Sequence, residues 1–245
     1  MNKKTVLVTG GTRGIGKSIV KIMASKGYDV VINYLNSDDI ASSLKEELEN
    51  KYDIKVLTYK ADISDENQVK SMLNKTIETF GRLDCLVNNA GIAIDTTFDM
   101  KTANNFRRIL DVNLIGPFLT SKYSYEYLKK TKGNIINIAS TNGIDTIYPE
   151  SMDYDASKAA LISLTKNLAI EFAPEVRVNA IAPGWVNTQM NKELDSDFIK
   201  NEESKILLSR FAEADEIANV VCFLASDEAS YINSEIIRVD GGFRA

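Results

Sequence analysis

Short apolar runs alternate with longer amphipathic segments along nearly the whole chain, and this alternation limits the possible folds more than any other feature. Repeated strand–helix units predict parallel strands joined by right-handed crossovers, which place helices on both faces of one sheet. Runs that are apolar almost throughout, such as 134–139 (NIINIA), are typical of strands covered on both faces. The predicted strands are 4–9, 29–34, 55–60, 84–88, 133–139, 176–182 and 235–239. The predicted helices are 14–26, 38–51, 65–80, 102–130, 151–172 and 213–226.

These elements predict an α/β fold with one domain over residues 1–245, built on a doubly wound, mostly parallel sheet. In such sheets ligands bind beyond the carboxyl ends of the strands, near the point where the strand order reverses. The polar segment 187–210 follows a predicted strand. We expect it to form a loop or a helical lid, since long insertions in compact domains are often functional.

The chain contains no histidine, which excludes a Ser-His-Asp triad, a His-ligated zinc site and an imidazole base. Acid–base chemistry must then come from Tyr, Lys, Cys or carboxylate groups. Cys85 and Cys222 lie in apolar runs and are expected in the core, so the sequence predicts neither a disulfide framework nor a metal site. The net charge of −5 gives no general attraction to nucleic acid or anionic lipid. Since no apolar run is long enough for a signal peptide or a membrane span, we expect a cytoplasmic protein.

A glycine-rich turn joins the first predicted strand to the first predicted helix, with the spacing Gly-x-x-x-Gly-x-Gly. Glycines allow a tight turn and a close approach of backbone to phosphate, and the following helix N-terminus offers free N–H groups. The position of the turn therefore favours a dinucleotide site over a glycine turn without a ligand. The residues expected to contact the dinucleotide here are Gly10, Thr12, Arg13, Gly14, Ile15 and Gly16.

The second predicted strand ends in Asn33-Tyr34, without the Asp or Glu that holds the ribose 2′-OH in NAD-specific sites. Arg13, inside the glycine turn, can pair with a 2′-phosphate. These two features predict NADPH rather than NADH as the cofactor. The alternative is that Arg13 is a solvated loop residue.

Tyr154 and Lys158 are four residues apart in a predicted helix, so their side chains lie on one face. A neighbouring ammonium lowers the pKa of a phenol, which suits Tyr154 to acid–base catalysis. A surface tyrosine beside a solvated lysine is the alternative. Ser140 ends a predicted strand and can donate to a substrate oxygen. Asn113 lies in an apolar helix and needs a polar partner, which core hydrogen bonding alone would also provide.

Taken together, these residues resemble the short-chain dehydrogenase/reductase family over nearly the whole chain. The motifs that carry the resemblance are Thr9-Gly10-x-x-x-Gly14-x-Gly16, Asp62, Asn88-Asn89-Ala90-Gly91, Asn113, Ser140, Tyr154-x-x-x-Lys158 and Pro183-Gly184. The resemblance implies a seven-stranded Rossmann sheet and assembly as a homotetramer.

The same resemblance implies a role for each site residue. Tyr154 would be the general acid/base, and Ser140 would orient the substrate oxygen. Lys158 would hold the nicotinamide ribose and lower the tyrosine pKa, and Asn113 would support a water-linked proton relay. Asp62 and Ile63 would flank the adenine. The remaining expected cofactor residues are Asn33, Tyr34, Asn89, Ala90, Gly91, Pro183, Gly184, Val186 and Thr188.

Within that family the chain is most similar to the 3-oxoacyl-[acyl-carrier-protein] reductases of fatty acid biosynthesis, through segments 178–184 and 236–242. It departs from them in the length of segment 140–154, at Ala173-Pro174-Glu175-Val176, where a carrier-protein arginine is often found, and at Phe211-Ala212-Glu213, where a glycine is usual. A 3-oxoacyl thioester is therefore the expected substrate. A sugar, polyol or small-alcohol dehydrogenase is the alternative, and a catalytically silent NAD(P)-binding regulator is the alternative from another class. Candidate pocket-wall residues are Tyr148, Met152, Trp185 and Met190.

Overall fold

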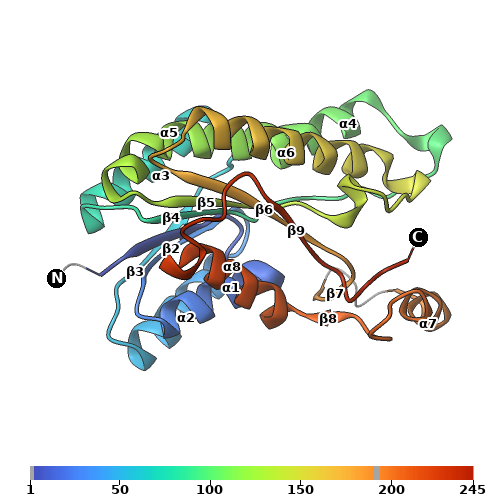
Figure 1. The fold of residues 1–245 in the computed structure, drawn as a ribbon, viewed down its shortest axis with the longest axis horizontal. Helices are drawn as coiled ribbons and strands as arrows, with labels where there is room; N and C mark the ends of the chain where they lie inside the picture. The colour runs from blue at the N-terminus through green and yellow to red at the C-terminus, as the bar shows by residue number, and fades with distance from the viewer. Residues whose placement is uncertain (1–2, 190–193, 245) are drawn as a thin grey trace.

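A parallel seven-stranded sheet lies between two layers of helices in the computed structural model, which describes residues 3–189 and 194–244 (Figure 1). The strand order is β3-β2-β1-β4-β5-β6-β9, so the order reverses between β1 and β4. In chain order these strands are β1 (Thr5–Val8), β2 (Asp29–Tyr34), β3 (Val56–Lys60), β4 (Cys85–Asn88), β5 (Asn134–Ile138), β6 (Arg177–Pro183) and β9 (Ile236–Val239). The predicted doubly wound Rossmann sheet is confirmed, and the ends of the predicted strands differ from these by at most one residue.

The helices divide between the two faces of the sheet. Figure 1 shows α3, α5 and α6 on one face and α1, α2 and α8 on the other. The α-helices are α1 (Gly14–Ser25), α2 (Asp38–Lys51), α3 (Glu66–Phe80), α4 (Ala103–Leu110), α5 (Gly116–Thr131), α6 (Met152–Glu171), α7 (Ser196–Ser204) and α8 (Ala214–Ala225).

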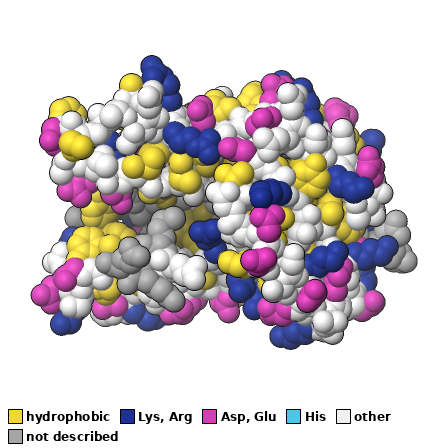
Figure 2. Space-filling model, turned by 180° about the vertical axis from the view of Figure 1, so that it is seen from behind, with side chains coloured by type: hydrophobic (Ala, Val, Ile, Leu, Met, Phe, Trp, Pro, Cys, Tyr) yellow, Lys and Arg dark blue, Asp and Glu magenta, His cyan; other side chains and the backbone are white. Residues whose placement is uncertain are grey.

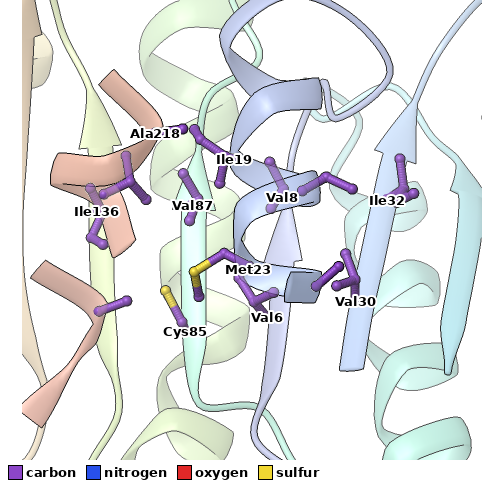
Figure 3. Packing of buried hydrophobic residues seen from close by; sticks show 14 of the residues in the cluster. Val6, Val8, Ile19, Met23, Val30, Ile32, Cys85, Val87, Ile136 and Ala218 are labelled. Atoms are coloured by element: carbon purple, nitrogen blue, oxygen red, sulfur yellow. The ribbon is translucent and has the colours of Figure 1, made fainter. Parts of the chain in front are cut away.

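Successive side chains of a strand point to opposite faces of the sheet. Because helices cover both faces here, the central strands are apolar throughout. In β1, Val6 and Val8 face the layer of α1 and α8, where they meet Ile19 and Met23, whereas Leu7 faces the opposite layer (Figure 3). Cys85 of β4 is fully buried in the first of these clusters, as predicted, and pairs directly with Val6.

One part of the fold differs from the sequence prediction, and one expected loop or lid segment contains a helix. The predicted helix 102–130 is divided into α4 and α5 by a π-helical turn, Asp111–Ile115. The apolar pattern does not reveal this turn, because one extra residue barely disturbs a helical periodicity. The segment 187–210 contains α7, whose first N–H groups are capped by the Asp195 side chain. The short strands β7 (Val186–Asn187) and β8 (Ala212–Glu213) pair on either side of it.

No helix within the described ranges is both long and apolar enough to cross a membrane.

Candidate active site

The glycine turn lies at the carboxyl end of β1, beside the point where the strand order reverses. Gly10 and Gly14 have φ angles of +64° and +50°, which side-chain-bearing residues rarely adopt. A Cβ on Gly16 would lie 2.3 Å from the Gly10 carbonyl oxygen. The turn and the start of α1 are thus packed backbone against backbone, and glycine is required at these positions.

The N-terminus of α1 suits an anionic ligand. Among the described residues no side chain caps this helix, and its first turn carries no acidic residue. The uncapped N–H groups and the positive end of the helix dipole are the donors that a pyrophosphate needs. The site therefore fits the phosphate part of a dinucleotide. Thr12 is buried in the turn, and Ile15 packs against the core below it.

Arg13 reaches the end of β2, where its Nη2 donates to the Ser37 hydroxyl at 2.8 Å. Ser37 is the N-cap of α2 but does not use its hydroxyl for capping. The first acid after β2 is Asp38. Its two carboxylate oxygens accept hydrogen bonds from the Tyr34 hydroxyl and from Lys60 Nζ. A guanidinium and a hydroxyl thus meet where an NAD-specific site would place a carboxylate. The sequence did not predict Ser37 as a cofactor residue. Its position four residues after Asn33, just beyond the second strand, is the signal that could have identified it.

Asn33, which is expected to contact the cofactor, has its side chain hydrogen-bonded within the protein. Its side chain is 2% exposed, accepts from the Gly10 N–H and donates to the Ala61 carbonyl. The amide therefore holds the glycine turn against β2 and β3.

The segment after β4 connects the glycine turn to α6. Asn89 donates from its side chain to the carbonyls of Thr9 and Gly10, and the Ala90 N–H donates to the Thr9 hydroxyl. Gly91 follows, and a Cβ placed on it would lie 3.3 Å from Asn113 Oδ1 and 3.5 Å from Lys158 Nζ. These contacts bring the turn, the π-helical turn and α6 to one place.

Asn113 is fully buried in the π-helical turn and uses its side chain to join two segments. It accepts from the Ile92 N–H, and it donates to the Ile92 carbonyl and the Ser157 hydroxyl at 2.9 and 3.0 Å. Because π-helical turns are frequent at functional sites, this interruption of a long helix marks the position.

Ser140, Tyr154 and Lys158 lie together at the carboxyl end of β5, as the sequence predicted. The Ser140 side chain lies close enough to the Tyr154 hydroxyl to favour its ionised form. Lys158 Nζ is buried, donates to the Ile138 carbonyl at 2.7 Å and lies 5.5 Å from the centre of the Tyr154 ring.

The electrostatics of this cluster differ from the sequence prediction in one respect. Burial raises the pKa of Tyr154 to about 12, and nearby Asp155 and Asp95 add to the rise, although the hydrogen bond with Ser140 opposes it. Burial also lowers the pKa of Lys158 to about 8. The expected lowering of the tyrosine pKa by Lys158 is therefore not found, because the cost of burying a phenolate dominates.

The other predicted residues surround the same region. Burial opposes the ionisation of Asp62, but hydrogen bonds from Ser64 and Arg108 outweigh it and lower the Asp62 pKa. Ile63 is buried against Gly116. Pro183 ends β6, and the N–H of the next residue, Gly184, donates to the Val239 carbonyl. Val186 is buried in β7. Thr188 lies beside Gly14, since a Cβ on that glycine would lie 3.5 Å from its methyl carbon.

The molecule is hollowed on the side of α4 and α7, with hydrophobic side chains on both sides of the hollow (Figure 2). Of the predicted wall residues, Tyr148 and Trp185 come together, with ring centres 5.7 Å apart. Met152 begins α6, and Met190 lies outside the described residues. Within the described part of the chain, no group of three or more Cys, Asp or Glu side chains is arranged to hold a metal ion.

A buried ion pair fixes the residue before Tyr154. Lys101 Nζ binds Asp153 at 2.8 Å and the Ile94 carbonyl at 2.6 Å, while Asp153 also accepts from the Tyr154 N–H. Both charged side chains are at most 6% exposed. The pair fastens segment 92–101 to the first turn of α6.

We expect Lys101→Met to lower the free energy of unfolding by about 3 kcal/mol, because it leaves the Asp153 charge buried without its partner. Urea unfolding measures the loss. The double variant Lys101→Met/Asp153→Asn should recover part of it. Lys75→Met, which removes an exposed pair with Glu78, should cost less than about 1 kcal/mol. Equal effects of Lys101→Met and Lys75→Met would contradict the interpretation.

Comparison with known protein families agrees with this arrangement. Residues 10–244 match the family model described as enoyl-(acyl carrier protein) reductase. The 3-oxoacyl-[acyl-carrier-protein] reductase FabG of Staphylococcus aureus (strain Mu50) is 38% identical over 98% of this chain and 97% of its own length. The FabG of Thermotoga maritima is 37% identical over the same shares.

Solved structures share the fold as well. A dehydrogenase/reductase from Sinorhizobium meliloti superposes with a TM-score of 0.95 at 32% identity, covering 100% of this chain and 96% of that one. A mutant short-chain dehydrogenase/reductase of Serratia marcescens gives 0.93 at 34% identity, covering 99% and 98%. A blue fluorescent protein from a metagenomic library, in complex with NADPH, gives 0.93 at 31% identity, covering 100% and 99%.

Proposed function

The chain belongs to the short-chain dehydrogenase/reductase family, and from that premise we propose that it reduces the 3-keto group of a 3-oxoacyl thioester with NADPH. The observation that carries the proposal is the contact of Tyr154 with Ser140, next to buried Lys158 and the glycine turn. The reaction converts a carbonyl into an alcohol, and its reverse oxidises the alcohol.

Tyr154 and Ser140 supply the proton chemistry. With a pKa of about 12, the Tyr154 phenol is protonated at neutral pH, which suits a residue that must donate a proton. As negative charge develops on the substrate oxygen, Tyr154 donates its proton to that oxygen and Ser140 donates a second hydrogen bond. Lys158 holds the nicotinamide ribose, and Asn113 supports a water-linked proton relay through Lys158.

The nicotinamide cofactor, when bound, supplies or accepts the hydride. Arg13 and Ser37 bind the 2′-phosphate of NADPH, and the uncapped start of α1 binds the pyrophosphate. Asp62 and Ile63 flank the adenine. Tyr154 and Lys158 would hold the nicotinamide ribose, and Pro183, Gly184, Val186 and Thr188 would line the nicotinamide. Asn89, Ala90 and Gly91 would also contact the cofactor.

The substrate class follows from the relatives, whose names specify 3-oxoacyl groups on acyl carrier protein. We further propose that the protein is a single-domain enzyme, that it works as a homotetramer, and that its substrates are thioesters of acyl carrier protein. The intact Ser140, Tyr154 and Lys158 set argues against a silent regulator, because a sensor of the cofactor does not need a proton donor.

The test compares NADPH oxidation by acetoacetyl thioesters of coenzyme A and of acyl carrier protein with NADP+ reduction by a panel of sugars, polyols and small alcohols. Turnover of the thioesters with the higher kcat/KM supports the proposal. A higher kcat/KM for any sugar or polyol would overturn it. A preference for the carrier-protein thioester identifies the partner.

A further inference from the structure

Glu202 places a carboxylate in a buried position on α7, a helix that otherwise lies at the surface. The residue is 1% exposed. Its Oε2 accepts from the Tyr148 hydroxyl at 2.5 Å and from Trp185 Nε1 at 3.1 Å, while Oε1 accepts from Lys205 Nζ at 2.5 Å. A buried carboxylate is costly unless its lone pairs are satisfied, so these bonds fix α7 at one position.

The partners of Glu202 come from separate parts of the chain. Tyr148 lies in segment 141–153, between Ser140 and Tyr154, and Trp185 directly follows Pro183-Gly184. One carboxylate therefore ties α7 to the two segments that flank the proposed substrate and nicotinamide sites.

Aromatic packing closes the space around this carboxylate. The Trp185 ring stacks on Phe211 with centres 5.4 Å apart and meets the edges of Phe198 of α7 and Tyr148. The Phe211 ring thus supports Trp185 through this stacking contact, and Phe211 is itself 3% exposed.

A chain of hydrogen bonds leads from the cluster to Ser140. The Tyr148 N–H donates to Asp155, the residue after Tyr154, and the Asn142 amide donates to the same carboxylate at 2.7 Å. Asn142 also exchanges hydrogen bonds with the Ser140 hydroxyl. A displacement of Tyr148 therefore reaches the segment that carries Ser140.

We propose that Glu202 is a positioning residue that sets the acyl-chain length the enzyme accepts, by holding α7 against Tyr148 and Trp185. This inference rests on the proposed function for its substrates. Glu202 does not touch the reacting atoms. When the Tyr148–Glu202 bond is removed, segment 141–153 and α7 can separate, and a longer acyl chain gains room.

The test compares kcat/KM for a 3-oxododecanoyl thioester with kcat/KM for acetoacetyl thioester, both with NADPH. The ratio of the two constants does not depend on the fraction of active enzyme, so a loss of folded enzyme alone cannot change it. We expect Tyr148→Phe and Glu202→Met to raise the long-to-short ratio about tenfold. The matched controls, exposed Tyr231→Phe and neighbouring Glu203→Met, should leave it within about twofold.

Trp185 is the only tryptophan of the chain, so its fluorescence reports on this cluster without any substrate. The emission maximum should shift in Tyr148→Phe and in Glu202→Met, and it should stay in place in the two controls. Should Glu202→Met fail to fold, Tyr148→Phe retains the ring and still gives both measurements. An unchanged ratio together with unchanged emission in Tyr148→Phe overturns the inference. If the unaltered enzyme reduces neither thioester, the proposed function fails, and the emission alone decides on the Glu202 contact.

Discussion

Replacement of Tyr154 by phenylalanine is expected to lower kcat for carbonyl reduction by about 10³-fold or more, because it removes the proton donor beside Ser140. The chain has no histidine that can take over. Stopped-flow or steady-state assays of NADPH oxidation with acetoacetyl thioester measure the loss of kcat. The Kd for NADPH should change little, since the glycine turn, Arg13 and Lys158 are untouched.

Tyr231→Phe is the matched control for this experiment. Tyr231 is fully exposed and is none of the proposed site residues, so loss of its hydroxyl should leave kcat for the short substrate near the unaltered value. Near-normal turnover by Tyr154→Phe, or equal losses in the two variants, would refute the assignment of Tyr154 as the acid.

The sequence predicted the sheet well because its signals are local. An apolar run such as Ile135-Ile136 identifies a strand covered on both faces wherever it occurs, and glycines identify the turn that joins β1 to α1. The end of a predicted strand placed Ser140 at the carboxyl edge of the sheet, whereas its partnership with Tyr154 came from the family resemblance.

The properties that sequence analysis missed depend on contacts between distant segments. The pKa of Tyr154 follows from burial by the surrounding segments, so a Tyr-x-x-x-Lys spacing alone gives the wrong direction. Asn33 matched a cofactor position but holds the glycine turn, since its partner is the Gly10 N–H. Glu202 had no signal at all, because an acid in a polar helical segment is ordinarily solvated.

Arg13 and Ser37 give the second large effect, a change in cofactor preference. Removal of both side chains in Arg13→Ala/Ser37→Ala is expected to lower kcat/KM for NADPH about 10³-fold, since the two proposed donors to the 2′-phosphate are lost. The kcat/KM for NADH should change by less than about threefold, because NADH carries no phosphate at that position. Each constant is measured with the same acetoacetyl thioester.

The control for charge alone is Lys17→Ala, which removes a cation one turn along α1 without touching the Arg13–Ser37 contact. Lys17→Ala should lower kcat/KM for NADPH and for NADH slightly and by the same factor. Because Arg13 is exposed, the ratio of kcat/KM for NADPH to kcat/KM for NADH should fall as salt is raised. The kcat/KM for NADH itself should stay constant. Equal losses for NADPH and NADH in the double variant would show that Arg13 only supports the glycine turn. No loss with NADPH would show that Arg13 is a solvated loop residue, and in both cases the preference for NADPH would lose its physical basis.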